Sequence, residues 1–452
     1  MPDCKSIHEQ VTYRLVLVAP DSGNVLAALD GNDLRLPRIA IPRWTRPARH
    51  IQHTMHTLWN AKVVILDFLN DCPGSPVCIA ELLSARIPEV LLAVPLDSLG
   101  VSELTLQERE TLREICSGNS ANRGPFSRTG WISEVLAWIQ ESTHYKLPFT
   151  GEIEQHNAGG SFALVRLALQ NGAAYWLKAV GAPNLHEFSI TTTLAGLYPE
   201  YLPAVVATHG KWNAWVMEDA GMSAGQNSNA DFLESTVIAM AELQKKTCGH
   251  EDDLLRAGAA DQRMGVLAGH IDELITYLDD AMQLQTSIKV PPLGTKRLRE
   301  IGEVLKNACA AMEALCIPNT IIHNDINPGN ILLRNAGCVF IDWCEACVGN
   351  PFLTLQSLLL LAPKNCRDYE LNTRRLKQLY GSRWISWLPA CNIDRAFALA
   401  PLLAIASHLY GRGDWLKSDR RDDPRVQSYS RALARHMDRA ASASQLTEAL
   451  CR

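Results

Sequence analysis

The stretch from Ile321 to Trp343 holds the residues of this sequence that are best suited to chemistry. His323, Asp325 and Asn330 form the pattern H-x-D-x-x-x-x-N between two apolar runs, and Asp342 follows another short apolar run. Two carboxylates and a carboxamide offer only oxygen ligands, which suit Mg²⁺ and not a soft metal. Phosphoryl transfer needs one Asp as a proton acceptor, with an Asn and a second Asp to hold Mg²⁺. The pattern favours this chemistry over an ordinary polar surface loop.

Residues upstream could supply the other parts of such a reaction. Asn157–Phe162 (NAGGSF) lies between two expected strands, as a loop that covers phosphates should. Lys178 follows in the strand after the next hairpin, and Glu187 opens the next helix; a Lys–Glu pair that directs an ammonium group at phosphates belongs to this machinery. Trp215–Asp219 ends a strand at a domain junction, where an adenine ring would meet backbone groups. Each feature alone is weak, but their order along the chain predicts a two-lobed, kinase-like fold.

The elements that must position these residues follow from local patterns. Asn171-Gly172 suits a type I′ turn, which predicts a hairpin between strands over Ser161–Leu169 and Ala173–Val180. A strand is expected over Gly151–His156, a helix over Asn184–Leu197 and a short strand over Ala214–Met217. Beyond Ser223 the apolar spacing is helical. We expect helices over Asp231–Lys246, Asp272–Leu284, Lys296–Leu315, Phe352–Leu361, Arg367–Tyr380, Asp394–Leu409 and Pro424–Ala441.

The first part of the chain has a different pattern of expected strands and helices, which predicts a small α/β domain. Its expected strands are Tyr13–Ala19, Val25–Leu29 and Lys62–Leu69, and its expected helices are Arg46–Asn60, Leu104–Ser117 and Trp131–Glu141. The sequence thus predicts an α+β chain in three parts. These are an N-terminal α/β domain (1–145), an antiparallel-sheet N-lobe (146–222) and a helical C-lobe (223–452).

Residues 150–440 resemble the aminoglycoside phosphotransferase/choline kinase-like group of small-molecule kinases. His323–Leu332 is similar to the catalytic loop of that family, and Ile341–Pro351 is similar to its metal-binding segment with the Gly-x-Pro turn. The protein-kinase form would have Arg at the position of Asn324 and Phe-Gly at Trp343-Cys344.

Two positions depart from the family pattern. Asn327 stands where the family often has His, and Thr354 stands where an Asp often follows the Gly-x-Pro turn. Neither position is a metal ligand or the base, so the resemblance still implies activity.

The resemblance implies an ATP- and Mg²⁺-dependent enzyme that transfers the γ-phosphoryl group to a hydroxyl of a small molecule, such as an aminoglycoside, an amino alcohol or a sugar. Carried over by position, Asp325 is the catalytic base, Asn330 and Asp342 are the Mg²⁺ ligands, and His323 braces the loop. The implied nucleotide-binding residues are Asn157, Gly159, Gly160, Ser161, Lys178, Glu187, Met217, Glu218 and Asp219.

Alternative functions stay open at this point. The chain could be a non-catalytic nucleotide-binding pseudokinase or scaffold, could phosphorylate a peptide hydroxyl, or could transfer a nucleotidyl group. Acids and bases are about equal in number from Asp231 to the C-terminus. This balance weakens the aminoglycoside reading, because a polycation calls for an acidic pocket.

The N-terminal region resembles a Nudix fold in the order of its expected elements. Active Nudix enzymes chelate metal through glutamates, but no Asp or Glu occurs between Asp33 and Asp67. We therefore expect a binding or docking role. A basic run lies in this interval and comprises Arg35, Arg38, Arg43, Arg46 and Arg49, with Trp44 among them. The run is either a solvated or internally paired surface, or a site for an anion or an acidic partner such as a leader peptide.

Composition limits the partners. The chain has 452 residues, 47% of them hydrophobic, and a net charge of −5, which argues against a broad nucleic-acid-binding surface. No apolar run reaches the roughly 18 residues that span a bilayer, and the longest, Leu353–Ala362, is interpreted as a buried helix. The 13 cysteines show no regular spacing, and Met1–Gln10 does not look like a secretory signal. We expect a cytoplasmic chain with no nucleic-acid or membrane partner.

Overall fold

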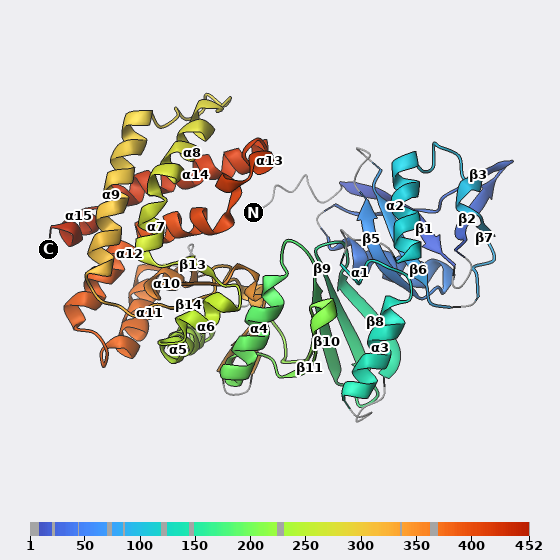
Figure 1. The fold of residues 1–452 in the computed structure, drawn as a ribbon, viewed down its shortest axis with the longest axis horizontal. Helices are drawn as coiled ribbons and strands as arrows, with labels where there is room; N and C mark the ends of the chain where they lie inside the picture. The colour runs from blue at the N-terminus through green and yellow to red at the C-terminus, as the bar shows by residue number, and fades with distance from the viewer. Residues whose placement is uncertain are drawn as a thin grey trace. The chain divides into compact units, whose positions relative to one another are not determined.

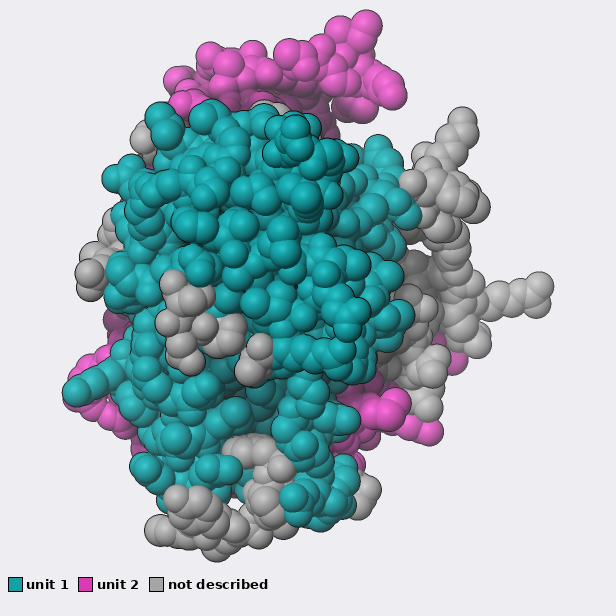
Figure 2. Space-filling view, turned by 90° about the vertical axis from the view of Figure 1, so that its right-hand side faces the viewer, with its two compact units in different colours: residues 1–188, 204–219 teal, residues 189–203, 220–452 magenta. Residues whose placement is uncertain are grey.

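The chain forms two compact units in a computed structural model, shown in different colours in Figure 2. Unit 1 comprises residues 1–188 and 204–219, and unit 2 comprises residues 189–203 and 220–452. The predicted N-terminal domain therefore falls within unit 1, as does the predicted N-lobe except for residues 189–203 and 220–222. The structure describes residues 9–19, 23–43, 45–69, 75–84, 86–118, 124–143, 149–223, 230–334, 337–361 and 369–451.

The N-terminal region of unit 1 is built on a seven-stranded mixed sheet with the strand order β3-β2-β1-β6-β5, in which β4 pairs with β1 and β7 with β2 (Figure 1). The strands are β1 (Gln10–Val18), β2 (Val25–Asp30), β3 (Asp33–Arg35), β4 (Arg38–Pro42), β5 (Val63–Leu69), β6 (Val77–Leu82) and β7 (Leu92–Val94). Side chains of β1 alternate between two cores, because successive residues of a strand face opposite sides. Leu15 and Leu17 pack with helix α1 (Pro47–Trp59), whereas Val16 and Val18 pack with α2 (Leu106–Ser117) and α3 (Trp131–Ser142).

The second sheet of unit 1 is antiparallel, with the order β11-β12-β10-β9-β8. Its strands are β8 (Phe149–Asn157), β9 (Phe162–Leu169), β10 (Ala174–Val180), β11 (Val205–His209) and β12 (Ala214–Glu218). Val165, Leu167 and Leu177 on one face share a single core with Val16 and with the buried side of α2 and α3. The N-terminal region and this sheet thus have a common core, although the sequence suggests separate domains.

The opposite face of this sheet carries a second set of side chains. Val180, Trp215 and Met217 form a small cluster there, with Phe162 and Trp176 packed against it. Helix α4 (His186–Leu197) follows β10, and the division between the two units falls within this helix, after Phe188. The predicted hairpin and helix are present, and β11 is a strand that the sequence analysis did not predict.

Unit 2 is mainly helical and has one large core. Its helices are α5 (Ala230–Thr247), α6 (Glu251–Arg256), α7 (Met264–Gly269), α8 (Ile271–Gln283), α9 (Thr295–Glu313), α10 (Phe352–Leu360), α11 (Tyr369–Trp384), α12 (Ala390–Arg412), α13 (Ser418–Arg421), α14 (Pro424–Ala441) and α15 (Ser444–Leu450). Two small sheets interrupt them, one of β13 (Ala260–Gln262), β17 (Cys347–Gly349) and β14 (Thr320–Ile322), the other of β15 (Ile331–Arg334) and β16 (Gly337–Phe340). The α+β fold class is confirmed, with a sheet-rich N-terminal part and a helical C-terminal part.

Helix α12 is, among the described residues, the one helix whose length and composition would let it cross a membrane. The sequence analysis named Leu353–Ala362 as the longest apolar stretch and predicted a helix over Asp394–Leu409, which covers most of α12, without considering it as a span. Ile393, Leu399 and Leu403 of α12 are buried in the core of unit 2. These contacts are those of a core helix, and length and composition alone are weak evidence for a span.

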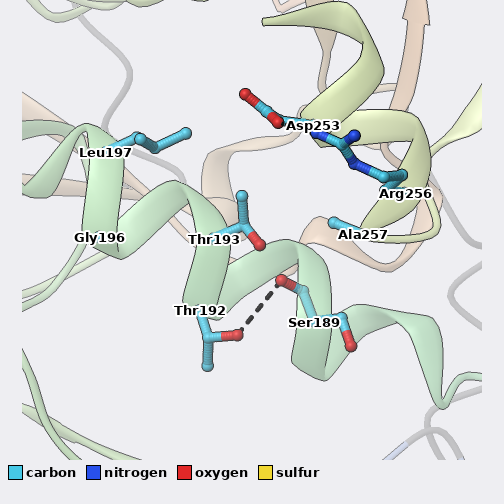
Figure 3. A pocket seen from close by; sticks show the side chains of 8 residues that line it. All are labelled: Ser189, Thr192, Thr193, Gly196, Leu197, Asp253, Arg256 and Ala257. Atoms are coloured by element: carbon cyan, nitrogen blue, oxygen red, sulfur yellow. Dashed lines mark hydrogen bonds and ion pairs between the residues drawn. The ribbon is translucent and has the colours of Figure 1, made fainter.

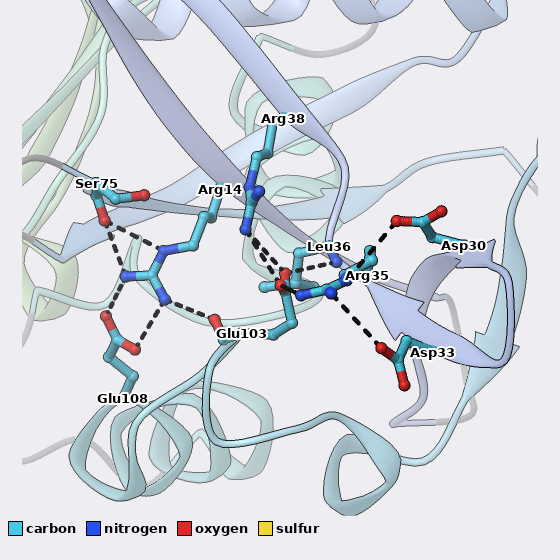
Figure 4. A network of polar contacts seen from close by, with 9 residues as sticks. All are labelled: Arg14, Asp30, Asp33, Arg35, Leu36, Arg38, Ser75, Glu103 and Glu108. Atoms are coloured by element: carbon cyan, nitrogen blue, oxygen red, sulfur yellow. Dashed lines mark hydrogen bonds and ion pairs between the residues drawn. The ribbon is translucent and has the colours of Figure 1, made fainter.

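A buried network of charges ties the N-terminal region together (Figure 4). Arg14 of β1 donates two hydrogen bonds to the carboxylate of Glu108 in α2, at 2.7 and 3.2 Å, and also binds the Glu103 carbonyl. The Glu103 side chain in turn accepts from Arg35 at 3.0 Å and from Arg38 at 3.1 Å. Both glutamates are buried, so their charges need these partners.

Salt bridges within the chain account for most of the basic run. Arg35 and Arg38 form salt bridges with Glu103. Arg43 pairs with Glu9 at 2.7 Å, and Arg49 pairs with Glu154 at 2.6 Å. The contacts favour intramolecular salt bridges over an anion site, and Trp44 lies outside the described residues. The Nudix-like resemblance of this region stays a prediction.

Candidate active site

The candidate catalytic loop lies between β14 and β15 of unit 2. Asn327 caps a short 3₁₀ turn, Pro328–Asn330, and its side chain accepts a hydrogen bond from the Gly329 amide at 2.9 Å. This turn aims the Asn330 side chain back at Asp325: Nδ2 donates to the Asp325 carbonyl at 2.9 Å and to its Oδ2 at 3.1 Å. Asn327 Nδ2 lies 3.3 Å from Oδ1 of the same carboxylate. Two asparagines therefore fix the orientation of Asp325.

Asp342 follows β16 in a left-handed backbone conformation, with φ +67° and ψ +65°. Such a conformation is uncommon for a residue other than glycine, and backbone strain of this kind often marks functional sites. The strand before Asp342 is tied to the catalytic loop, because the Ile341 amide donates to the Asn330 carbonyl at 3.0 Å. Asp325, Asn330 and Asp342 thus belong to one local structure.

His323 holds the catalytic loop to the strand that precedes Asp342. Its Nε2 donates to the Ile341 carbonyl at 2.8 Å, and its ring packs against Trp343 at 4.5 Å between centroids. Burial lowers the pKa of His323 below its ordinary value, so the ring is neutral near pH 7. A neutral, buried imidazole that is already donating suits a bracing role.

A buried polar cluster attaches the loop to the surrounding helices. The Tyr380 hydroxyl of α11 donates to Gln244 Oε1 at 2.7 Å, and Gln244 Nε2 of α5 donates to Thr354 Oγ1 at 3.0 Å. Thr247 Oγ1 accepts from the Ile321 amide at 3.1 Å. Thr354, which departs from the family pattern, is therefore a buried member of this cluster.

Three charged residues near Asp325 were missed by sequence reasoning. Glu345 is exposed, yet partial desolvation and the nearby charges of Asp325 and Asp342 raise its pKa. Burial lowers the pKa of His408, Arg412 lowers it further, and Asp325 opposes the shift. Glu345 could have been noticed as the third residue after Asp342, but nothing in the sequence links α12, which carries the other two, to the loop.

The donor set of this loop fits Mg²⁺. Asn330 points its Nδ2 at Asp325, so its Oδ1 is turned away from that carboxylate and can serve a cation, and Asp342 adds a second oxygen donor. Within the described ranges, no group of three or more His, Cys, Asp or Glu side chains forms an alternative metal centre. An oxygen-only set is the kind of set that Mg²⁺ prefers.

The nucleotide-binding residues predicted from the sequence lie in unit 1. Lys178 of β10 forms a salt bridge with Glu187 of α4 at 2.5 Å, and both side chains are buried. The Lys178 ammonium also lies 5.5 Å from the ring centroid of Phe162 and 5.8 Å from that of Trp215. The carboxylate and the two rings hold the ammonium group on the side of the sheet away from the N-terminal region.

A tryptophan on the same face was not predicted. Trp176 precedes Lys178 by two residues in β10, so both side chains lie on one side of the strand. Its register partner in β12 is Met217, and its ring lies 4.7 Å from that of His156. Because alternate residues of a strand lie on the same face, the position of Lys178 in the sequence could have indicated Trp176.

The backbone role expected for the junction residues in nucleotide binding stays a prediction. The Glu218 amide donates to the Ala204 carbonyl and the Asp219 amide donates to the Ala174 carbonyl, at 2.9 and 3.2 Å. A base could meet these residues only through their carbonyl oxygens. The loop Asn157–Ser161, with Gly159 and Gly160, forms the β8–β9 connection as predicted.

A shallow groove between α4 and α6 of unit 2 contains none of these residues (Figure 3). Its volume is about 600 Å³, and Ser189, Thr192, Asp253 and Arg256 are among the residues that line it. Asp253 is already paired with Arg256 and with His250. The groove therefore offers no unpaired charge.

A sheet with a buried Lys–Glu pair, together with a helical part whose loop carries Asp325, Asn330 and Asp342, has the parts that define a kinase-like phosphotransferase. Residues 239–375 match the model of the phosphotransferase enzyme family. This match includes all three loop residues and confirms the family resemblance. The match covers less than a third of the chain and shows that this segment is similar to phosphotransferases.

Solved structures give more distant similarities. A macrolide 2′-phosphotransferase from Brachybacterium faecium is 14% identical, with 66% of this chain and 97% of that chain covered at a TM-score of 0.43. A choline/ethanolamine kinase family protein from Mesorhizobium loti is 14% identical, with 71% and 98% covered at 0.45. An aminoglycoside phosphotransferase in complex with GDP and kanamycin is 15% identical, with 68% and 99% covered at 0.44. Because these TM-scores are below 0.5, the substrates of these proteins cannot be assigned to this chain. A search of curated proteins finds no match.

Proposed function

We propose that the chain is an ATP- and Mg²⁺-dependent O-phosphotransferase that moves the γ-phosphoryl group of ATP to a hydroxyl of a small molecule. The observation that carries the proposal is the pair of hydrogen bonds by which Asn330 fixes Asp325, next to the strand that ends at Asp342. The phosphotransferase family match over the same residues supports the reaction class.

Asp325 is the base in this proposal. Asn327 and Asn330 each occupy one side of its carboxylate, and its remaining lone pairs can accept the proton of the acceptor hydroxyl. The carboxylate would thereby hold the hydroxyl in line with the γ-phosphoryl group. Such positioning supplies a large share of the rate in phosphoryl transfer, and proton acceptance adds to it.

The nucleotide is bound by unit 1. Lys178 neutralises charge on the α- and β-phosphates, Glu187 keeps its ammonium group in place, and the loop Asn157–Ser161 covers the phosphates. Trp176 lies on the same face of β10 as Lys178 and pairs in register with Met217 of the junction strand, so it offers a surface on which the base can stack. Mg²⁺, held by Asn330 and Asp342, would neutralise charge on the phosphates.

The charges around Asp325 bear on the acceptor. Glu345 supplies a carboxylate, whereas the Arg412 guanidinium is paired with Asp414 at 2.6 Å and stacks on Tyr429 at 4.7 Å. Charges of both signs near Asp325 suit an amino alcohol, a sugar or a related natural product better than a polycationic aminoglycoside. The cysteines that the structure describes are free thiols, which supports the proposed cytoplasmic location.

A mass-shift screen tests the proposed function. The purified chain is incubated with Mg²⁺, ATP and pooled small hydroxyl compounds, and the products are compared with those of the Asp342→Ala variant. A product that gains one phosphate only with the wild-type chain supports the proposal.

The same screen separates the alternatives. A gain of a nucleotide would indicate nucleotidyl transfer, and ATP binding without any product, against both metabolites and hydroxyl-bearing peptides, would indicate a pseudokinase. A phosphorylated peptide with no phosphorylated metabolite would replace the small-molecule acceptor with a peptide hydroxyl.

A further inference from the structure

The loop Asn157–Ser161 is packed against the N-terminal region within unit 1. Ala158 is buried in the core that β1, α1 and β5 form, and not in the core of its own sheet. Gly159 has φ +134°, and a Cβ added to it would lie 3.8 Å from Asp67 Oδ1 and 4.0 Å from Phe68 Cδ2. The middle of the loop therefore rests against the end of β5.

Phe126, in the segment before α3, lies next to Gly181, and Gly181 lies against the loop. A Cβ added to Gly181 would lie 2.7 Å from the Gly160 carbonyl oxygen and 3.4 Å from Phe126 Cζ, so only glycine fits between them. The Gly181 amide donates to the Ser161 carbonyl at 2.8 Å. Phe126 is buried and packs on Trp131 at 5.9 Å between ring centroids.

Gln155 fixes the strand that leads into the loop. Its side-chain amide takes the place of a neighbouring strand for Ile65 of β5: Oε1 accepts from the Ile65 amide at 2.6 Å, and Nε2 donates to the Ile65 carbonyl at 2.9 Å. The Gln155 amide itself donates to Gln52 Oε1 of α1 at 2.8 Å. Gln155 is buried, so these bonds hold β8 in a fixed position relative to β5.

We propose that the N-terminal region is a positioning element for nucleotide phosphates, which holds the Asn157–Ser161 loop in its binding conformation. A glycine-containing loop loses much conformational freedom when it orders around a ligand. The burial of Ala158, the nearness of Asp67 and Phe68 to Gly159, and the position of Gly181 between Gly160 and Phe126 order the loop beforehand, so nucleotide binding is tighter than with a free loop. The inference rests on the proposed function, because it assumes that this loop covers nucleotide phosphates.

Phe126→Ala in the full-length chain tests the inference, with Ile115→Ala as the matched control. Ile115 is fully buried in the same core but belongs to α2, and none of the contacts described for the loop involves it. Both variants remove core volume, so both should lower the melting temperature. We expect Phe126→Ala alone to raise the KM for ATP about tenfold, with the KM for the acceptor changed less than twofold. Phe126→Leu should restore most of the ATP affinity.

Hydrogen exchange of the loop amides, measured without nucleotide, gives a readout that does not depend on activity. The amides of Gly159–Ser161 should lose protection in Phe126→Ala and keep it in Ile115→Ala. Equal loss of protection in both variants, or no loss in Phe126→Ala, would overturn the positioning role. A wild-type chain that binds no ATP would instead overturn the proposed function, and the exchange result would still decide whether the loop is pinned. If Phe126→Ala does not fold, Phe126→Val is compared with Ile115→Val in the same way.

Discussion

The Asn330 side chain donates to both the backbone carbonyl and the carboxylate of Asp325, at 2.9 and 3.1 Å. This relationship couples the expected metal ligand to the expected base. A single amide thus orients Asp325 through Nδ2 and leaves Oδ1 for a cation. Changes at Asn330 should therefore disturb proton acceptance and metal binding together.

Asn330→Ala should lower kcat by at least about 10²-fold and raise the Mg²⁺ concentration needed for half-maximal activity, because it removes an orienting donor and a ligand. Steady-state rates over a Mg²⁺ titration measure both effects. Asn327→Ala is the control, since its longer contact with Asp325 (3.3 Å) should cost rate without a shift in Mg²⁺ dependence. A shift of equal size in both variants would remove Asn330 from the metal site.

Glu187→Gln should raise the KM for ATP and lower stability by about 3–5 kcal/mol, because it removes a carboxylate that is paired with the buried Lys178 ammonium. Denaturant unfolding and initial rates measure the two effects. Glu200→Gln breaks the exposed pair with Lys246 and should change stability little and the KM for ATP not at all. Unchanged ATP affinity in Glu187→Gln would contradict the nucleotide role of the buried pair.

Trp176→Ala should weaken ATP binding by about 1–3 kcal/mol, the usual worth of stacking a base on an aromatic ring. Trp176→Phe should retain most of the affinity. Calorimetric titration with ATP, and with inorganic triphosphate as the base-free comparison, measures the effect. If the loss is as large for triphosphate as for ATP, Trp176 does not contact the base.

Acid should destabilise the N-terminal region through Glu108. Burial would raise the pKa of this carboxyl, but hydrogen bonds from Arg14 and the Thr105 amide bring it below its ordinary value. A lowered folded-state pKa means that the stabilisation is present above about pH 4.3 and is lost as the pH falls further. The free energy of unfolding should therefore drop more steeply between about pH 5 and 3 in the wild type than in Glu108→Gln. Glu89→Gln, in an exposed pair with Arg86, should keep the wild-type slope, and an identical slope in Glu108→Gln would refute the assignment.

Local patterns predicted those parts of the fold that depend on neighbouring residues. Asn171-Gly172 gave the hairpin between β9 and β10, and the helical spacing of Pro424–Ala441 gave the whole of α14. The catalytic loop was also readable, since Asp325 and Asn330 are five residues apart and meet within one turn.

Contacts between segments that are far apart in the chain could not be predicted from the sequence. Glu103 accepts from Arg38, which is 65 residues away, and Tyr380 donates to Gln244, which is 136 residues away. His408 and Arg412 come near Asp325 only because α12 packs against the small sheet that carries the loop. The core shared by the N-terminal region and the second sheet has the same origin, because alternation in β9 and β10 shows that a face is buried but not what buries it.

The central claim is that Asp325 accepts the proton of the acceptor hydroxyl. The most direct measurement is the single-turnover rate of phosphoryl transfer from ATP to the acceptor by Asp325→Asn, together with its affinity for Mg²⁺ and ATP. Loss of the base should lower this rate by about 10²- to 10⁴-fold while ATP affinity stays within about twofold of the wild type. A wild-type rate in Asp325→Asn would contradict the account.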